Sequence, residues 1–182
     1  MVGSGTKRAL LGISLALPAL LGAAPEPPPD TPQSPGAHVV TYDASGSAEF
    51  HAQVDHAARV WNASAHNVHF VPSHGPADVA VLADDGWPRT RVDALGSGEV
   101  RIGRQAVRAG YDLDRVTAHE FGHVLGLADT RSGLCRELMS GHSASVRCPN
   151  PWPDGAEVAA VERNFRPGAP PPARLYVDSA PR

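Results

Sequence analysis

The stretch HEFGHVLGLAD, residues 119–129, constrains the fold of this chain more than any other segment. Its two histidines are four positions apart, and an α-helix places residues i and i+4 on one face. Gly126 can adopt the left-handed backbone conformation that ends a helix, so the chain can turn back toward the two rings. The sequence therefore predicts that His119, His123 and Asp129 converge on one point beside a helix end.

Two imidazoles and one carboxylate suit a catalytic zinc ion, because three protein ligands leave a fourth coordination position open. Glu120 follows the first histidine, where a carboxylate that does not bind the metal can take a proton from a zinc-bound water. A bare H-E-x-x-H pattern also arises by chance, so the interpretation depends on Gly126, Asp129 and the helical context. Three glutamates are alternative third ligands: Glu137, Glu157 and Glu162. Asp129 is closer to the histidines and follows the turn glycine.

The same segment, followed by CRELMSG, resembles snapalysin, a family of small secreted bacterial zinc endopeptidases. The family's motif is H-E-x-x-H-x-x-G-x-x-D with a methionine turn after it, and the likeness covers about residues 39–165. The resemblance implies a metzincin-like α+β fold. Its expected parts are a small twisted mixed sheet, an amphipathic N-terminal helix, a zinc-binding active-site helix and a C-terminal helix.

For the site, the resemblance implies zinc on His119, His123 and Asp129, Glu120 as the general base and Met139 beneath the metal. It also implies hydrolysis of peptide bonds in proteins, with a zinc-bound water as the nucleophile. A preference for an aromatic residue just after the scissile bond belongs to the same expectation. The cofactor is then Zn²⁺, and the partners are protein or peptide substrates.

One position departs from the family pattern. The family usually carries a tyrosine two residues after the ligand aspartate, where this chain has Arg131. Arginine can also stabilise an oxyanion, but with a different reach and charge.

The family further places calcium at the positions of Asp112 and Asp114, and carboxylate oxygens suit Ca²⁺. Helix capping is the alternative role for an aspartate at a helix start.

The chain has two cysteines, Cys135 and Cys148. An exported protein meets an oxidising compartment and no third thiol competes, so we expect a disulfide bond that closes a loop around Met139. A zinc-binding pair is the alternative, although neither cysteine has a His or Cys partner at zinc-finger spacing.

The N-terminal residues have the layout of a secretory signal peptide. Lys7 and Arg8 precede the apolar run ALLGISLALPALLGAA, which ends in small residues. We therefore expect a signal peptide over 1–24, a Pro-rich linker or short pro-segment over 25–36, a zinc metalloprotease domain over 37–166 and a disordered Pro-rich tail over 167–182. Pro18 interrupts the apolar run, which makes a retained membrane anchor the weaker alternative. The mature protein is expected to be extracellular and free of the membrane.

Hydrophobic periodicity predicts the elements of this domain. Alternation of apolar and polar residues predicts strands at 38–42, 67–72, 77–84 and 98–103. Apolar steps of three and four predict an amphipathic helix within 47–65, and further helices are expected at 111–125 and 154–165. The strand at 98–103 is predicted at the sheet edge, where it could hold an extended substrate through backbone hydrogen bonds.

Composition excludes some functions. The chain has 182 residues, of which 42% are hydrophobic, enough for one core, and its net charge of -3 gives no basic field for nucleic acid. A monomer is expected.

We interpret the sequence as a secreted zinc metalloendopeptidase. The alternative is a catalytically inactive secreted zinc-binding or interaction module, which would not need Glu120.

Overall fold

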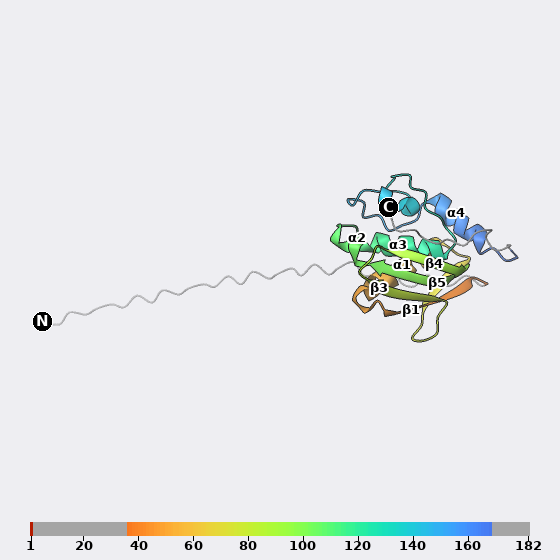
Figure 1. Cartoon of the computed structure of the whole chain (residues 1–182), viewed down its shortest axis with the longest axis horizontal. Helices are drawn as coiled ribbons and strands as arrows, with labels where there is room; N and C mark the ends of the chain where they lie inside the picture. The colour runs from red at the N-terminus through yellow and green to blue at the C-terminus, as the bar shows by residue number, and fades with distance from the viewer. Residues whose placement is uncertain (2–35, 169–182) are drawn as a thin grey trace.

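The computed structural model describes Met1 and residues 36–168. The predicted signal peptide, the proline-rich segment after it and the C-terminal tail lie almost entirely outside the described residues. Residues 36–168 form one body in which helices cover a single sheet (Figure 1). Among the helices of this described part, none has the length and apolarity that crossing a membrane requires.

The sheet is mixed, as predicted. Its strands are β1 His38–Gly46, β2 Val68–Pro72, β3 Val79–Asp84, β4 Arg89–Ala94 and β5 Ser97–Gly103, in the order β2-β1-β3-β5-β4. β1 pairs in parallel with β2 and β3, and β3 pairs in parallel with β5. β4 pairs antiparallel with β5 and forms one edge of the sheet.

The position of the edge strand corrects one prediction. Residues 98–103 lie in β5, which has a strand on each side, whereas the edge beside the active-site helix is β4. The strand β4 was not predicted. Its sequence, RTRVDA, contains three charged side chains, and such a pattern is also typical of a loop. Charged residues are nevertheless common on edge strands, because they discourage pairing with another chain.

Three of the helices lie where periodicity predicts them. A 3₁₀ turn η1 (Ala48–Phe50) leads into α1 (His51–Ser64), the predicted active-site helix is α3 (Leu113–Val124), and α4 (Gly155–Asn164) follows the loop that contains Met139. A short helix α2 (Arg104–Arg108) and a 3₁₀ segment η2 (Leu138–Ser143) were not predicted. With 5 and 6 residues, both are too short for a hydrophobic periodicity to show itself.

The core lies between the sheet and helices α1 and α3, which share one face of it (Figure 1). α1 packs on β2, and α3 packs on β4 and β5. The indole nitrogen Nε1 of the fully buried Trp61 donates to the carbonyl oxygen of Ala118 at 2.9 Å. This bond ties α1 to the turn of α3 just before the first histidine, so the core fixes the active-site helix on the sheet.

Candidate metal centre and catalytic cleft

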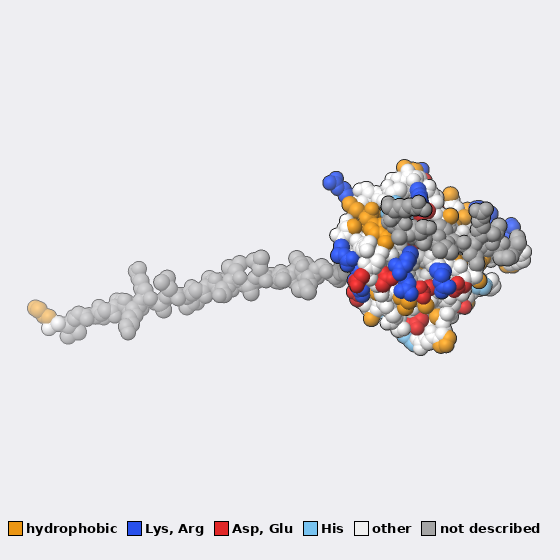
Figure 2. Space-filling model, in the orientation of Figure 1, with side chains coloured by type: hydrophobic (Ala, Val, Ile, Leu, Met, Phe, Trp, Pro, Cys, Tyr) orange, Lys and Arg blue, Asp and Glu red, His pale blue; other side chains and the backbone are white. Residues whose placement is uncertain are grey.

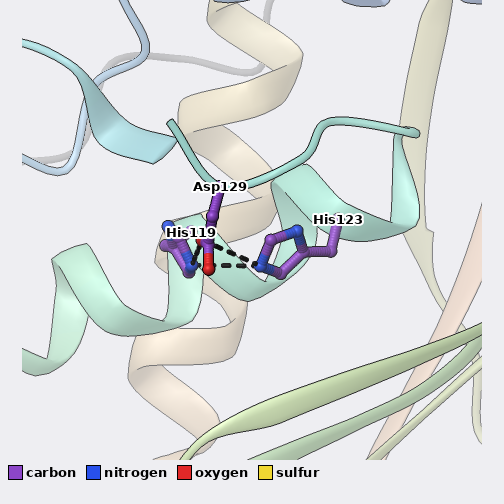
Figure 3. A group of neighbouring side chains, drawn as sticks. All are labelled: His119, His123 and Asp129. Carbon is purple, nitrogen blue, oxygen red and sulfur yellow. Dashed lines mark hydrogen bonds and ion pairs between the residues drawn. The ribbon is translucent and has the colours of Figure 1, made fainter. Parts of the chain in front are cut away.

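The side chains of His119, His123 and Asp129 point toward one another (Figure 3). The Nε2 atoms of the two rings are 3.0 Å apart, and Oδ1 of Asp129 is 3.2 Å from the first and 3.7 Å from the second. Two ligand atoms about 2.0–2.1 Å from a tetrahedral ion are about 3.3–3.4 Å apart, so all three separations fit one metal ion to within about 0.4 Å.

Both rings are oriented by backbone carbonyls on their far side. Nδ1 of His119 lies 3.0 Å from the carbonyl oxygen of Leu138, and Nδ1 of His123 lies 2.8 Å from that of Leu127. A carbonyl can only accept, so each Nδ1 carries the proton and donates it. The lone pair of a neutral ring is then on Nε2, the atom that faces the other ligands.

The electrostatics of the two rings differ. Burial disfavours the charged form of His119, but the contact with Asp129 and the charge of Glu120 outweigh it and raise the pKa of His119. Burial, reinforced by the charge of His119, lowers the pKa of His123 to about 3. The pair therefore shares no more than one charge, and a bound metal ion would displace that proton.

A tight turn carries Asp129 back to the histidines. Gly126 has φ +84°, and its N–H donates to the carbonyl oxygen of His123 at 2.9 Å, so the left-handed glycine predicted from the sequence ends α3. Beyond the aspartate, Arg131 has φ +51° and is 61% exposed. Its Nε lies 3.7 Å from Oδ2 of Asp129, the carboxylate oxygen other than the one nearest the rings.

Glu120 lines the same cleft as His119 and Asp129 and is 3% exposed. Its Oε2 accepts a hydrogen bond of 2.6 Å from Oγ1 of Thr90, a buried residue of β4. The edge strand therefore contacts the candidate base directly. Nothing in the sequence marks Thr90, because it lies 30 positions before Glu120 in a strand that periodicity does not reveal.

Met139 packs against α3 at Gly122 and is 1% exposed. Its Sδ would be 2.6 Å from a Cβ added at Gly122, so only a glycine between the two histidines allows this approach. The backbone N–H groups of Leu138 and Met139 donate to the carboxylate of Glu157 at 3.1 and 2.7 Å. Glu157, one of the alternative third ligands, thus holds the methionine turn from α4.

The loop before α4 is held by Arg115 and by a disulfide bond. The guanidinium of Arg115 donates to the carbonyl oxygens of Cys135, Glu137 and Asn150 at 3.1, 2.6 and 2.7 Å. Cys135 and Cys148 are bonded, with their Cα atoms 5.5 Å apart, which confirms the predicted pairing. The loop that presents Leu138 to His119 is therefore fastened at several points.

The cleft continues from His119 and Asp129 into a mostly apolar hollow. Its walls include Trp87, Pro88, Tyr111, Val116 and Leu138. The rings of Trp87 and Tyr111 meet edge to face with centroids 5.6 Å apart. The arrangement offers a side-chain pocket beside the candidate metal and the candidate base.

The remaining predicted residues take other positions. The side chain of Asp112 caps α3, accepting from the backbone N–H of Arg115 at 2.9 Å, as in the capping alternative. Asp114 lies 3.3 Å from Nδ1 of His56. Glu137 accepts from the Thr130 hydroxyl at 3.0 Å and is not part of the three-residue cluster.

Two histidines from one helix, a carboxylate beyond a glycine turn and a buried glutamate in the same cleft define the site of the H-E-x-x-H zinc peptidases as a class. The chain belongs to the Streptomyces extracellular neutral proteinase (M7) family, whose model matches residues 37–168. The resemblance to snapalysin is thereby confirmed, and so is the predicted α+β fold class.

Curated relatives are called extracellular small neutral protease. That of Streptomyces lividans is 38% identical over 134 residues, which are 72% of this chain and 59% of the relative. That of Streptomyces caespitosus is 40% identical over 124 residues, which are 67% of this chain and 92% of the relative. The chain thus spans about three fifths of the first protein and nearly all of the second.

Among solved structures, the chain is similar to the high choriolytic enzyme 1 of Oryzias latipes, a hatching enzyme zinc-protease. The match has a TM-score of 0.40 and 24% identity, and it covers 52% of this chain and 46% of the other. The family assignment therefore rests on the match over residues 37–168 and on the curated relatives.

Proposed function

We propose that this chain is a secreted zinc metalloendopeptidase that hydrolyses peptide bonds in proteins. The observation that carries the proposal is the convergence of His119, His123 and Asp129 on one point. Two of these residues, His119 and Asp129, line one cleft together with Glu120. His119 and His123 offer Nε2 atoms, and Asp129 offers Oδ1 to the same point. A bound zinc ion would activate a water molecule and polarise the scissile carbonyl.

Proton transfer and charge stabilisation are assigned to residues of the chain. Glu120 takes the proton from the attacking water and passes it to the leaving amine, as a buried carboxylate beside the ligands can do. Asp129 supplies a negative charge to the metal, while Arg131 lies on the outer side of that carboxylate. Arg131 is exposed and lines the cleft, and its guanidinium is assigned the stabilisation of the developing oxyanion.

Substrate recognition combines the edge strand and the apolar hollow. An extended peptide adds to the outer edge of β4, which pairs with no second strand among residues 36–168, through backbone hydrogen bonds. This role belongs to β4 and not to the strand 98–103 that the sequence predicts for it. The side chain after the scissile bond enters the hollow between Trp87, Tyr111 and Leu138. Aromatic walls suit an aromatic guest, because offset and edge-to-face ring contacts add to its burial.

The charge of the surface agrees with a soluble substrate of mixed composition. Figure 2 shows basic and acidic side chains side by side on the visible face of the domain. Arg101 pairs with Glu99, and Arg104 pairs with Asp85. The visible face therefore offers no broad field of one sign that would favour a polyanion.

A casein-clearing assay with and without a zinc chelator tests the activity. Glu120→Gln should keep its zinc but lose about 10²- to 10⁴-fold in turnover, because the ligands remain and the base is gone. Asp129→Ala should lose zinc on dialysis, since two histidines hold the ion weakly. Glu137→Gln is the matched control and should keep both zinc and activity.

Near wild-type turnover in Glu120→Gln would remove the base from the proposal. A protein that binds zinc but cleaves neither casein nor peptides would be the inactive binding module.

Calcium at Asp112 and Asp114 is part of the proposal, supported by the two carboxylates at the start of α3. A rise in melting temperature with added Ca²⁺ that Asp114→Asn abolishes is the expected result.

A further inference from the structure

We propose that Thr90 is a positioning residue that holds the carboxylate of Glu120 in place for proton transfer. The inference rests on the proposed peptidase function and adds a residue from the edge strand to it. Thr90 belongs to β4 and Glu120 to α3, so the contact joins two elements that the fold packs together.

The contact is short and buried. Oγ1 of Thr90 lies 2.6 Å from Oε2 of Glu120 and 3.2 Å from the carbonyl oxygen of the same residue. Thr90 is 1% exposed and Glu120 is 3% exposed. A hydroxyl has one proton to donate, and the shorter contact to the charged oxygen is the stronger of the two. Thr90 therefore donates to the carboxylate.

The donor is itself held firmly. A β-branched side chain has few accessible rotamers, and the backbone of Thr90 is paired with Val100 in the neighbouring strand. Glutamate has three rotatable side-chain bonds, so a short hydrogen bond to one carboxylate oxygen restricts the orientations open to the group. The hydroxyl of Thr90 holds Oε2 of Glu120, and this contact also sets the direction in which Oε1 points.

The same strand is the proposed docking edge for the substrate. A peptide paired with β4 is placed relative to the backbone of Thr90, and Thr90 places Glu120. The distance between the base and the scissile bond is thus set through one strand. Misplacement of a catalytic group by about 1 Å can cost about 10²-fold in rate, so this link should show in turnover.

The test compares Thr90→Val, which removes the hydroxyl at constant shape, with Thr90→Ser, which retains it. Thr90→Val should lower kcat by about 10- to 100-fold with KM and zinc content near wild type. Thr90→Ser should recover kcat to within about threefold of wild type. Thr117→Val is the matched control, because its buried hydroxyl donates within α3 to the Leu113 carbonyl oxygen at 2.8 Å.

A double-mutant cycle assigns the effect to the carboxylate. In a Glu120→Gln background Thr90→Val should cause little further loss of turnover, and the two substitutions should be non-additive in the free energy of unfolding. If Thr90→Val does not fold, Thr90→Ala and Thr90→Ser make the same comparison.

Wild-type kcat in Thr90→Val, an equal loss in Thr90→Ser, or full additivity with Glu120→Gln would each overturn the role of Thr90. The proposed function would survive these results if wild type cleaves casein and Glu120→Gln does not. A wild-type protein without peptidase activity would overturn both.

Discussion

Gly122 decides how closely the methionine turn can approach the two histidines. It directly precedes His123, and a Cβ there would lie 2.6 Å from Sδ of Met139 and 3.2 Å from Cζ2 of Trp61. Both neighbours are buried, so neither can move aside into solvent. The glycine inside H-E-F-G-H is therefore a packing requirement of this site.

Gly122→Ala should lower the free energy of unfolding by about 1–2 kcal/mol, because overpacking costs about 1–3 kcal/mol and the better helix propensity of alanine returns up to about 1 kcal/mol. Zinc affinity should fall as well, since the displaced helix turn carries both histidines. Gly155→Ala in α4 is the control, because its Cβ would meet nothing within 4 Å. Equal melting temperatures for the two variants would contradict the packing argument.

At the residue scale, the sequence predicts the parts of the site that depend on local geometry. The four-residue spacing of His119 and His123 and the turn at Gly126 bring in Asp129 without reference to the rest of the fold. Thr90, Arg115 and Glu157 could not be found in this way. Their partners lie 30, 22 and 18 positions away in the sequence, and such contacts arise only when sheet, helix and loop have packed.

At the scale of elements, long periodic segments were predicted and short charged ones were not. The apolar stripe of α1 and the alternation in β3 and β5 depend on the burial of one face, which leaves a clear pattern. β4 has Thr90 and Val92 facing the core between charged neighbours, and that is too brief a pattern to distinguish from a loop. The strand that contacts Glu120, β4, could therefore not be predicted from the sequence.

The start of β4 is held by Asp84, the last residue of β3. Its carboxylate accepts from Arg89 and from the backbone N–H of Gly86. The hydrogen bond with Arg89, followed by the Gly86 bond and the charge of Arg101, lowers the pKa of Asp84 despite partial burial. A lowered pKa in the folded state means that the carboxylate stabilises the fold above its ordinary pKa of about 3.9 and that this contribution is lost as the pH falls below it.

Asp84→Asn should therefore lower stability at pH 7 by about 1 kcal/mol, and the difference from wild type should shrink as the pH falls below about 4. Melting temperatures of both proteins across pH 3–7 measure this, with pH values chosen around the ordinary pKa of about 3.9. Asp93→Asn in β4 is the control, since its pair with Arg91 is largely exposed and contributes little. A difference for Asp84→Asn that stays constant with pH would contradict the role of its charge.

At the scale of the whole molecule, the site is formed by the sheet, the helices packed on it and the disulfide-bonded loop 135–148. The sheet and α1 fix the active-site helix from below, while the loop from Cys135 to Cys148 closes over it and supplies the Leu138 carbonyl to His119. Within this loop the side chains of Leu138, Met139 and Ala144 are buried, while much of the rest is exposed. Its order depends on Arg115, on Glu157 and on the disulfide bond.

Removal of the disulfide bond should therefore destabilise the domain and loosen the methionine turn. A bond across 13 positions contributes about 3 kcal/mol by its effect on the unfolded chain, which corresponds to a drop in melting temperature on the order of 10 °C. The Cys135→Ser/Cys148→Ser variant should show this drop and a weaker hold on zinc. Reduction of wild type with a phosphine that does not chelate zinc should reproduce both effects and leave the double variant unchanged. Two free thiols in properly exported protein, measured by mass spectrometry, or a double variant as stable as wild type would show that the loop is held by Arg115 and Glu157 without the bond.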